Sequence, residues 1–405
     1  MRAVLHIGTE KTGSTFLQRA LYKNEIQLKK RAVFLTKSME YPNNRVLPAL
    51  FQKEVDDWSF RHGASDMPGH REAVERYLPN IAAELDALQK AEGTVILSSE
   101  HCHSRLRDVE AVAALRKFLC KYFDDITVVC YFRQQYSMAR SYYSTLLKGS
   151  YTESWETFVS HEVREENYYF NFLKIADVWS EEFGNDACKF RVYDRENLEG
   201  GNLFVDFLEC IGLGSVKSFV NAKLSDYNKS LSGTEQQIFR LINQYFPYYQ
   251  RGSQDINPVN TELKAAVRSA KLEGRVIDEG GESQEEVLQR FRVSNEVLFR
   301  KYFSEEAGFR VKDTRLDSDV RRFNHNADAD DLKGILKVLE KIFKSLGDAR
   351  IMTDRDIDSV RDAATLLEKE SLEMASRLMQ LCFRARPEGK FISQKVEQYK
   401  KGLCK

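Results

Sequence analysis

Residues 3–15 read Ala-Val-Leu-His-Ile-Gly-Thr-Glu-Lys-Thr-Gly-Ser-Thr, an apolar run that stops at a glycine and leads into a short polar loop. The run Ala3–Ile7 predicts a β-strand, and the apolar spacing that follows predicts a helix over Ser14–Lys23. Glycines let the loop turn tightly, so several backbone N–H groups can point at one anion, and the helix N-terminus adds a partial positive charge. Lys11 supplies a full charge. The stretch therefore predicts an anion-binding loop; the alternative is an ordinary strand-to-helix turn with an exposed lysine.

The first half of the chain alternates short β-branched runs with longer helical patterns, which predicts an α/β fold with a parallel central sheet flanked by helices. The runs are almost continuously apolar, as expected for strands that helices cover on both faces. The predicted strands are Ala3–Ile7, Ala32–Leu35, Thr94–Leu97, Ile126–Phe132 and Lys189–Val192. The predicted helices are Ser14–Lys23, Arg71–Lys90, Val109–Tyr122, Gln135–Leu147 and Trp155–Phe183.

We expect an α/β domain over residues 1–305 and a mainly helical C-terminal region over residues 306–405. Residues 36–69 contain three prolines and predict an irregular insertion, of the kind that covers a binding site. Residues 252–281 are polar and rich in glycine, and a helical pattern then resumes. The pattern over Ala363–Leu403 resembles a helical hairpin of the tetratricopeptide kind, through which a homo-oligomer could form.

Composition excludes several classes of protein. The 405 residues carry 61 Lys+Arg and 61 Asp+Glu, so the net charge is zero, and 42% of them are hydrophobic. The chain is therefore neither disordered nor a protein that coats nucleic acid through its overall field. Its most apolar run, residues 126–132, is far shorter than the ~20 residues of a membrane-spanning helix. The N-terminus lacks the apolar region of a signal peptide, and none of the seven cysteines forms a C-x-x-C pair, so we expect a reduced, cytoplasmic protein.

A second anion-binding signal lies at the end of the fourth predicted strand. The strand Ile126–Phe132 delivers Arg133 at its carboxyl end, where ligands bind in open α/β sheets. Ser141 follows eight residues later, about two helical turns on. A guanidinium and a hydroxyl so placed can hold one phosphate from two sides. The alternative is that Arg133 forms a structural salt bridge and Ser141 is a surface hydroxyl.

These two segments resemble the nucleotide-binding motifs of sulfotransferases that use 3′-phosphoadenosine 5′-phosphosulfate (PAPS). Residues 6–18 are similar to the opening of bacterial carbohydrate-type members, and Arg133-x₇-Ser141 resembles the 3′-phosphate motif, with Gln134-Gln135 where Asn-Pro is common. The resemblance implies a P-loop NTPase-like sulfotransferase fold. It implies that PAPS is bound by Gly8, Thr9, Lys11, Thr12, Gly13, Ser14, Thr15, Arg133 and Ser141, that 3′-phosphoadenosine 5′-phosphate (PAP) is the product, and that no metal is needed.

The third predicted strand, Thr94–Leu97, ends in Ser-Ser-Glu-His-Cys-His. Sulfuryl transfer to a hydroxyl needs a base for the acceptor proton and a cation for the leaving phosphate oxygen. Lys11 suits the second task, and Glu100 or His101 the first; the family resemblance favours Glu100. Glu100 could instead complement the dipole of a helix N-terminus. A zinc site built on His101 and His103 is the weaker alternative, because no further ligand is paired with them.

Later matches are weaker. Lys229 and Ser230 resemble a family segment that returns to the nucleotide, whereas Ser232 and Glu235 form a capping-box pattern that explains the segment without a ligand. In the insertion, Trp58, with Arg61 and His62 nearby, could contact a sugar, but we favour a core anchor.

The predicted function is transfer of the sulfuryl group of PAPS to a carbohydrate hydroxyl. The first alternative is a P-loop nucleoside or sugar kinase, against which the missing Gly-Lys-Ser/Thr triplet counts. The second is a catalytically inactive nucleotide-binding scaffold protein. Positive charge is concentrated where the nucleotide would lie: residues 1–31 hold seven Lys/Arg against two Asp/Glu, and residues 126–148 hold three Lys/Arg and no acid.

Overall fold

The computed structural model describes residues 1–214, 219, 230–250, 255–269, 282–303, 308–309, 354–368 and 372–403. The chain divides into two compact units. The first comprises Met1–Tyr142, Glu156–Lys229 and Gly281–Lys312, and the second comprises Tyr143–Trp155, Ser230–Gly280 and Asp313–Lys405. In the described part of the chain, no helix combines the length and the apolar character needed to cross a membrane.

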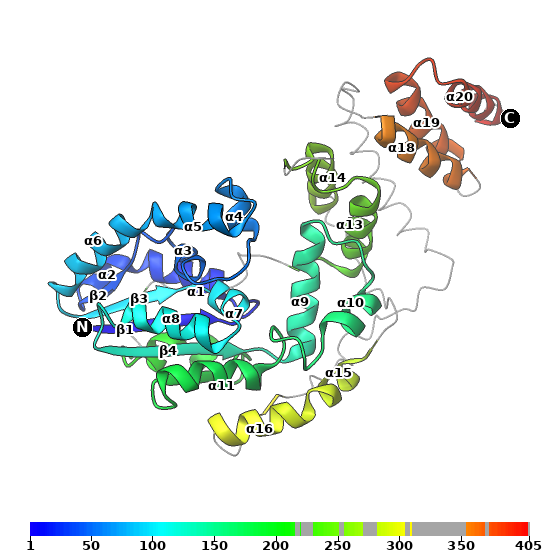
Figure 1. Cartoon of the computed structure of the whole chain (residues 1–405). Coiled ribbons are helices and arrows are strands. Elements are labelled where there is room, and N and C mark those ends of the chain that lie inside the picture. The colour runs from blue at the N-terminus through cyan, green and yellow to red at the C-terminus, as the bar shows by residue number, and fades with distance from the viewer. Residues whose placement is uncertain are drawn as a thin grey trace. The chain divides into compact units, whose positions relative to one another are not determined.

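The first unit is built on a five-stranded parallel sheet with the order β2-β3-β1-β4-β5 (Figure 1). All five predicted strands are confirmed. Their bounds are Arg2–Gly8 (β1), Val33–Leu35 (β2), Thr94–Ser98 (β3), Asp125–Phe132 (β4) and Cys188–Val192 (β5). The predicted α/β class with a parallel central sheet is therefore correct.

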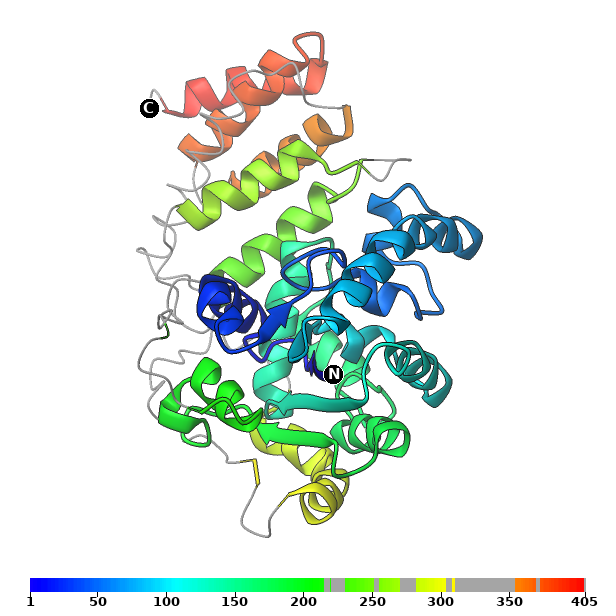
Figure 2. The ribbon, with the colours of Figure 1, turned by 90° about the vertical axis from the view of Figure 1, so that its left-hand side faces the viewer.

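Helices cover both faces of this sheet (Figure 2). On one face, α1 (Ser14–Lys23), α2 (Glu25–Lys29) and α12 (Leu203–Cys210) bury apolar side chains against alternate strand residues. Those strand residues are Val4, Val33, Ile96, Val129 and Tyr131. On the other, α11 (Phe172–Phe183) packs on β4 and β5 and against α8 (Val109–Leu119). Both Cys130 and Cys188 are buried.

Two helical predictions need correction. The predicted helix Arg71–Lys90 is two helices, α5 (Met67–Glu75) and α6 (Leu78–Gln89), because Pro79 suits the first turn of a new helix and not the interior of an old one. The predicted helix Trp155–Phe183 is also two, α10 (Trp155–Glu162) and α11, and the side chain of Asn171 caps the second. The insertion 36–69 consists mostly of turns and loops, with two short helices, α3 (Val46–Ala49) and α4 (Asp57–Arg61), within it.

The insertion has its own core, in which Trp58 is fully buried. The Trp58 indole donates a hydrogen bond to Glu40 (2.9 Å), and the ring of His62 stacks on it with centroids 4.0 Å apart. Trp58 is therefore the core anchor that we favoured. Arg61 pairs with Asp57 at the surface.

The second unit starts inside α9 (Gln135–Lys148) and includes α13 (Gly233–Tyr245) and α14 (Pro258–Ser269). Asn243 donates to the carbonyl oxygens of Leu147 and Tyr151, and the Lys264 ammonium donates to those of Lys148 and Gly149. These bonds tie residues 230–280 to the end of α9, so the division differs from the expected boundary at 305. Helix α14 lies within residues 252–281, the stretch that is polar and rich in glycine.

The C-terminal part of the second unit contains α18 (Asp354–Leu367), α19 (Leu372–Ala385) and α20 (Lys390–Leu403). Helix α19 packs against both α18 and α20, and the predicted hairpin around Pro387 is present. The rest of the predicted C-terminal region, residues 306–353, falls almost entirely outside the described residues.

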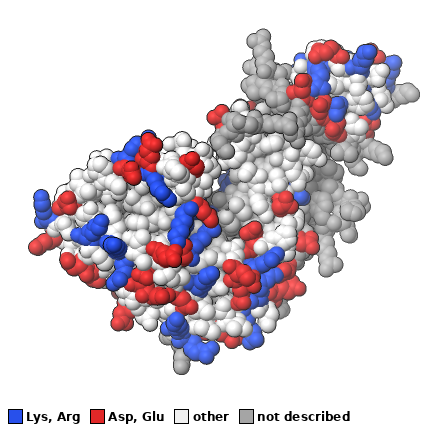
Figure 3. Space-filling view, in the orientation of Figure 1, with Lys and Arg blue, Asp and Glu red and all other residues white. Residues whose placement is uncertain are grey.

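Charge is evenly mixed on the face of the molecule that Figure 3 shows, where Lys and Arg side chains alternate with Asp and Glu.

A buried ionic cluster lies beneath the surface of the first unit. Asp206, which is fully buried, accepts two hydrogen bonds from Arg191 (both 2.6 Å), one from the Tyr131 hydroxyl (2.7 Å) and one from the Glu199 backbone N–H (2.9 Å).

We therefore expect Asp206→Asn to destabilise the first unit by about 2–4 kcal/mol, because it leaves the Arg191 guanidinium beside an amide that cannot neutralise it. Urea unfolding followed by circular dichroism measures this change. Asp186→Asn, at an exposed position, is the matched control and should shift the transition by less than about 0.5 kcal/mol. Equal effects of the two variants would contradict a structural role for the cluster.

Candidate functional site

The site is built at the carboxyl edge of the sheet, where β1 lies between β3 and β4. After β1 the chain continues to β2, at one end of the strand order, and after β4 it continues to β5, at the opposite end. Because these connections diverge, the ends of β1 and β4 form the crevice in which open α/β sheets bind their ligands. The loop Gly8–Gly13 follows β1, and Arg133 follows β4.

The loop after β1 is held against β4. The backbone N–H and the side-chain hydroxyl of Thr9 both donate to the carbonyl oxygen of Tyr131 at 3.0 Å, and the Thr12 hydroxyl donates to the carbonyl oxygen of Thr9 at 2.6 Å. Lys11 has a left-handed backbone with φ of 66°, which costs a non-glycine residue conformational energy. A rare conformation held by surrounding hydrogen bonds is typical of ligand-binding loops.

Gly13 begins helix α1 with φ of 79°. A Cβ atom there would lie 3.0 Å from both the Tyr193 hydroxyl oxygen and Leu203 Cδ2, so the position has no room for a larger residue. Gly13 has no side chain with which to cap α1, whereas α4, α5, α8, α11, α12 and α13 are each capped by an Asp, Asn or Ser side chain. The start of α1, including the half-buried Thr15 and the buried Ser14, therefore suits an anion.

Arg133 lies beside this loop, as the sequence predicts. Its guanidinium donates to the carbonyl oxygen of Lys11 (3.1 Å) and lies 5.9 Å from the centre of the Tyr193 ring. Burial lowers the pKa of Arg133, although Tyr193 and Asp194 counteract this. The arginine therefore joins the ends of β1 and β4.

A cavity of about 300 Å³ opens next to Arg133, at the carboxyl ends of β4 and β5. Two arginines, an aspartate and two aromatic rings contribute to its wall, which suits an anionic ligand with a ring system. The lining residues are Arg133, Gln134, Ser137, Val192, Tyr193, Asp194, Arg195, Asn197, Leu198, Gly201, Gly308 and Phe309. Ser137, not Ser141, lines this cavity in the described structure. Ser141 lies one turn further along α9, and its predicted role stays a prediction.

The charged groups of Glu100 and Lys11 lie close enough to affect each other's ionisation. Burial lowers the pKa of Lys11, the carboxylates of Glu10 and Glu100 oppose this effect, and Arg133 adds to it. Glu100 lies at the N-terminus of α7 (His101–Arg105), where its charge could complement the helix dipole, which was the alternative to a catalytic role. Its carboxylate, however, caps no N–H group of that helix. It accepts a hydrogen bond from the Gln18 amide of α1 instead, at 2.7 Å.

Glu10 is a site residue to which the sequence analysis gave no role. Its carboxylate accepts a hydrogen bond from the Tyr169 hydroxyl (3.0 Å) and lies 3.8 Å from Nδ1 of His101 and 3.9 Å from Arg105. Burial alone would raise the pKa of Glu10, but His101, Lys11 and neighbouring groups outweigh it and lower that pKa to about 2. Its position next to Lys11 was the only available signal, because Tyr169 lies 159 positions away.

His103 is engaged on both ring nitrogens. Nδ1 accepts from the Glu10 backbone N–H (3.3 Å), and Nε2 donates to the carbonyl oxygen of Tyr169 (3.0 Å). Burial lowers its pKa to about 4, so the ring is neutral near pH 7. With both nitrogens held by backbone groups, His103 is a poor candidate for the zinc ligand that we considered.

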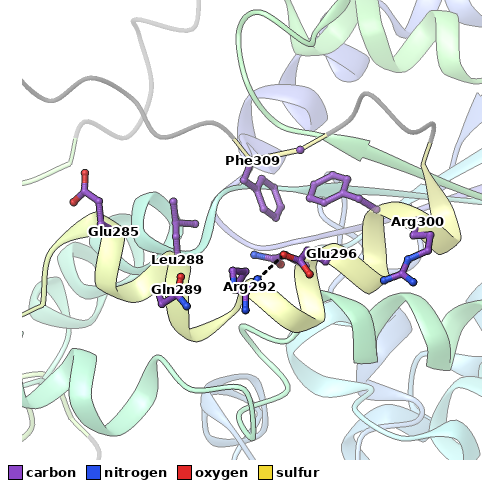
Figure 4. Close-up of a pocket in the computed structure, with 10 residues that line it drawn as sticks. Glu285, Leu288, Gln289, Arg292, Glu296, Arg300 and Phe309 are labelled. Carbon is purple, nitrogen blue, oxygen red and sulfur yellow. Dashed lines mark hydrogen bonds and ion pairs between the residues drawn. The ribbon is translucent and has the colours of Figure 1, made fainter.

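A second cavity, of about 700 Å³, runs along α15 (Gln284–Arg290) and α16 (Arg292–Tyr302). Figure 4 shows Leu288 and Arg292 on these helices with Phe309 facing them. Arg292 is paired with Glu296 (3.1 Å), and Phe309 also lines the cavity beside Arg133. None of the predicted site residues lines this second cavity.

The remaining predicted residues are less informative. Lys229 lies outside the described residues. Ser230 is exposed and belongs to the second unit, so its predicted contact with the nucleotide stays a prediction. The capping box of Ser232 and Glu235 is confirmed, and it accounts for the start of α13 without a ligand.

Comparison with known proteins gives one relative. The chain is 26% identical over 212 residues to an uncharacterized protein of Archaeoglobus fulgidus, a match that covers 52% of this chain and 54% of the relative. The chain thus spans about half the length of the relative that it matches. No family model matches the chain, and no solved structure matches it.

Two buried histidines predict how stability depends on pH. Burial lowers the pKa of His6 to about 3 and that of His103 to about 4, from 6.5 in the unfolded chain. The unfolded state therefore binds more protons below pH 6.5, so stability is complete above that pH and is lost as the pH falls toward 4. Each histidine contributes up to about 1.4 kcal/mol per pH unit in this window.

Urea unfolding at pH 7.0, 6.0 and 5.0 tests this expectation. His6→Asn, which preserves an acceptor for Ser98, should reduce the slope, and the other buried histidines should account for what remains. The matched control is His161→Asn, at an exposed position of α10. A slope that stays the same in His6→Asn would contradict the expectation.

Proposed function

We propose that this protein transfers the sulfuryl group of PAPS to a hydroxyl of a carbohydrate, on a P-loop NTPase-like sulfotransferase fold. One observation carries the proposal: the Arg133 guanidinium donates to the carbonyl oxygen of Lys11. This contact supports a site in which two cations, from the ends of β1 and β4, face one nucleotide that carries a phosphate at its 3′ position and a phosphosulfate at its 5′ position. The anion cradle at Gly13 and the cavity beside Arg133 support the same function.

In this proposal the two ends of the nucleotide bind to different strands. The 5′-phosphosulfate lies on the start of α1, where Gly8, Thr9 and Thr12 shape the loop and Lys11 supplies charge. The 3′-phosphate lies against Arg133 in the cavity, with Ser137 or Ser141 as the hydroxyl donor from α9. Guanidinium groups hold phosphate oxygens in pairs, which favours arginine at this position.

The proposed reaction is a single in-line displacement. The acceptor oxygen forms a bond to sulfur while the bond between sulfur and the 5′-phosphate oxygen breaks, and PAP leaves with the bonding electrons. Lys11 stabilises the charge that develops on the leaving phosphate oxygen. The acceptor proton passes to Glu100 or His101, which both follow β3.

The alternatives have less support. A P-loop kinase needs a carboxylate that holds Mg²⁺ near the phosphates, and in the described structure β4 delivers Arg133 at that edge instead. An inactive scaffold protein would have no need for Lys11, Glu10, Glu100 and His101 in one cluster. Transfer of radiolabelled sulfate from PAPS to a panel of oligosaccharides, lipids and phenols would identify the acceptor.

Nucleotide binding gives the first test. We expect PAP to bind without magnesium in calorimetry, and we expect Arg133→Ala to weaken PAP by at least about 30-fold, or about 2 kcal/mol. Adenosine 5′-phosphosulfate lacks the 3′-phosphate, so its affinity should change much less. The matched control is Arg116→Ala, at an exposed position of α8. Preference for ATP with magnesium, or equal losses for both nucleotides, would refute the assignment.

The proton acceptor gives the second test. We expect removal of the base, by Glu100→Gln or His101→Gln, to lower turnover by about 10²–10⁴-fold while PAP affinity stays near that of the wild type. Rates with radiolabelled PAPS and an acceptor from the panel measure the two variants side by side. Full activity in both variants would exclude a base at the end of β3.

A further inference from the structure

Glu10 and His101 lie next to each other although they come from different strand ends. Glu10 belongs to the loop after β1, and His101 is the first residue of α7, after β3. Oε1 of Glu10 lies 3.8 Å from Nδ1 of His101, and the two side chains are only 15% and 23% exposed. A carboxylate at this position can orient an imidazole and fix its tautomer.

The Glu10 carboxylate is held from several directions. Its Oε2 accepts a hydrogen bond from the Tyr169 hydroxyl (3.0 Å), and the Tyr169 ring stacks on that of Tyr142 with centroids 4.4 Å apart. Arg105 lies 3.9 Å from Oε1 and is itself bonded to Asp56 at 2.5 Å. Since the neighbours fix the carboxylate, Oε1 is the oxygen that faces His101.

The position of the His101 ring leaves its Nδ1 atom available to a carboxylate. Its Nδ1 is buried and has no hydrogen-bond partner among the described residues, and Oε1 of Glu10 lies 3.8 Å from it. The exposed part of the ring therefore lies on its other atoms. Glu100 differs in this respect, because its carboxylate already accepts a hydrogen bond from Gln18. Catalytic hydrogen bonds are often long in the free enzyme and tighten in the complex.

We propose that Glu10 is the positioning residue for His101, which takes the proton of the acceptor hydroxyl in the sulfuryl transfer proposed above. The Glu10 carboxylate holds the proton on Nδ1, so Nε2 carries the lone pair that faces the acceptor. As the acceptor oxygen bonds to sulfur and PAP leaves, the acceptor proton moves to Nε2, and the resulting imidazolium is stabilised by Glu10. This inference rests on the proposed function and assigns the base within it.

The charged surroundings fit this role. Burial lowers the pKa of His101, so the ring is neutral and able to accept a proton near pH 7. The carboxylates of Glu100 and Glu10 oppose that effect, and the more distant charges of Arg45 and Arg105 add to it. Removal of the Glu10 charge should therefore lower the pKa of His101 further.

Nitrogen NMR of the protein labelled with ¹⁵N-histidine tests the proposal without knowledge of the acceptor. Long-range ¹H–¹⁵N spectra distinguish the two neutral tautomers, and His101→Gln assigns the signal among the seven histidines. We expect the Nδ1–H tautomer for His101 in the wild type. In Glu10→Gln we expect the Nε2–H form to become populated and the titration midpoint to fall. Glu110→Gln, which removes an exposed carboxylate from α8, should change neither.

The proposal can be tested on the wild type alone if Glu10→Gln fails to fold. An Nε2–H tautomer of His101 in the wild type would overturn the proposal. So would a signal that is identical in Glu10→Gln. With an acceptor from the panel, Glu10→Gln should lower turnover by about 10²-fold and move the acidic limb of the pH–rate profile to lower pH; unchanged turnover would also overturn it. Calorimetry with PAP on the same samples separates this failure from failure of the proposed function, since only the latter abolishes PAP binding in the wild type.

Discussion

The parallel pairing of β1 with β4 is the constraint on which the site depends. It brings the carbonyl oxygen of Tyr131 to the point where the loop after β1 begins, and Thr9 binds that oxygen through both its backbone and its side chain. The loop is thereby fixed before it reaches Lys11, and the Lys11 carbonyl oxygen then receives the Arg133 guanidinium. On the other side of β1, the parallel neighbour β3 delivers Glu100 and His101. Charged groups from three separate segments meet because one strand lies between two others in register.

Much of this arrangement can be predicted from the sequence, for a physical reason. Strands that are buried on both faces must be almost continuously apolar, so all five are visible as short apolar runs. The start of α1 at Ser14 is equally plain, because the loop before it contains two glycines. The helix boundaries were less predictable. Nothing in the apolar spacing of 155–183 reveals that the chain turns before Asn171, and nothing in the apolar spacing of the insertion reveals α4, which begins at a capping box of Asp56 and Ser59.

The candidate site was predictable in part. Lys11, Arg133 and Glu100 each follow the carboxyl end of a strand within three residues, and parallel strands place such residues at one edge, so their meeting follows from topology. Glu10 was missed because its partners Tyr169, His101 and Arg105 come from distant segments with no motif of their own. The division of the chain into two units was missed for a similar reason, since the bonds from Asn243 and Lys264 to the end of α9 follow no sequence pattern. Hydrogen bonds and ion pairs between polar residues that are far apart in the sequence depend on how the chain packs, which a single sequence does not reveal.

The left-handed backbone of Lys11 has a consequence for how this loop can vary. Glycine adopts that conformation without cost, whereas a lysine there gives up roughly 1 kcal/mol of stability. A chain that needed only the turn would gain stability by replacing this residue. Lysine at position 11 thus exchanges stability for a positive charge fixed between the ends of β1 and β4. A variant with glycine at position 11 would lose the charge and could have a higher free energy of unfolding than the wild type. A screen for thermal stability alone would therefore select against the function of the loop.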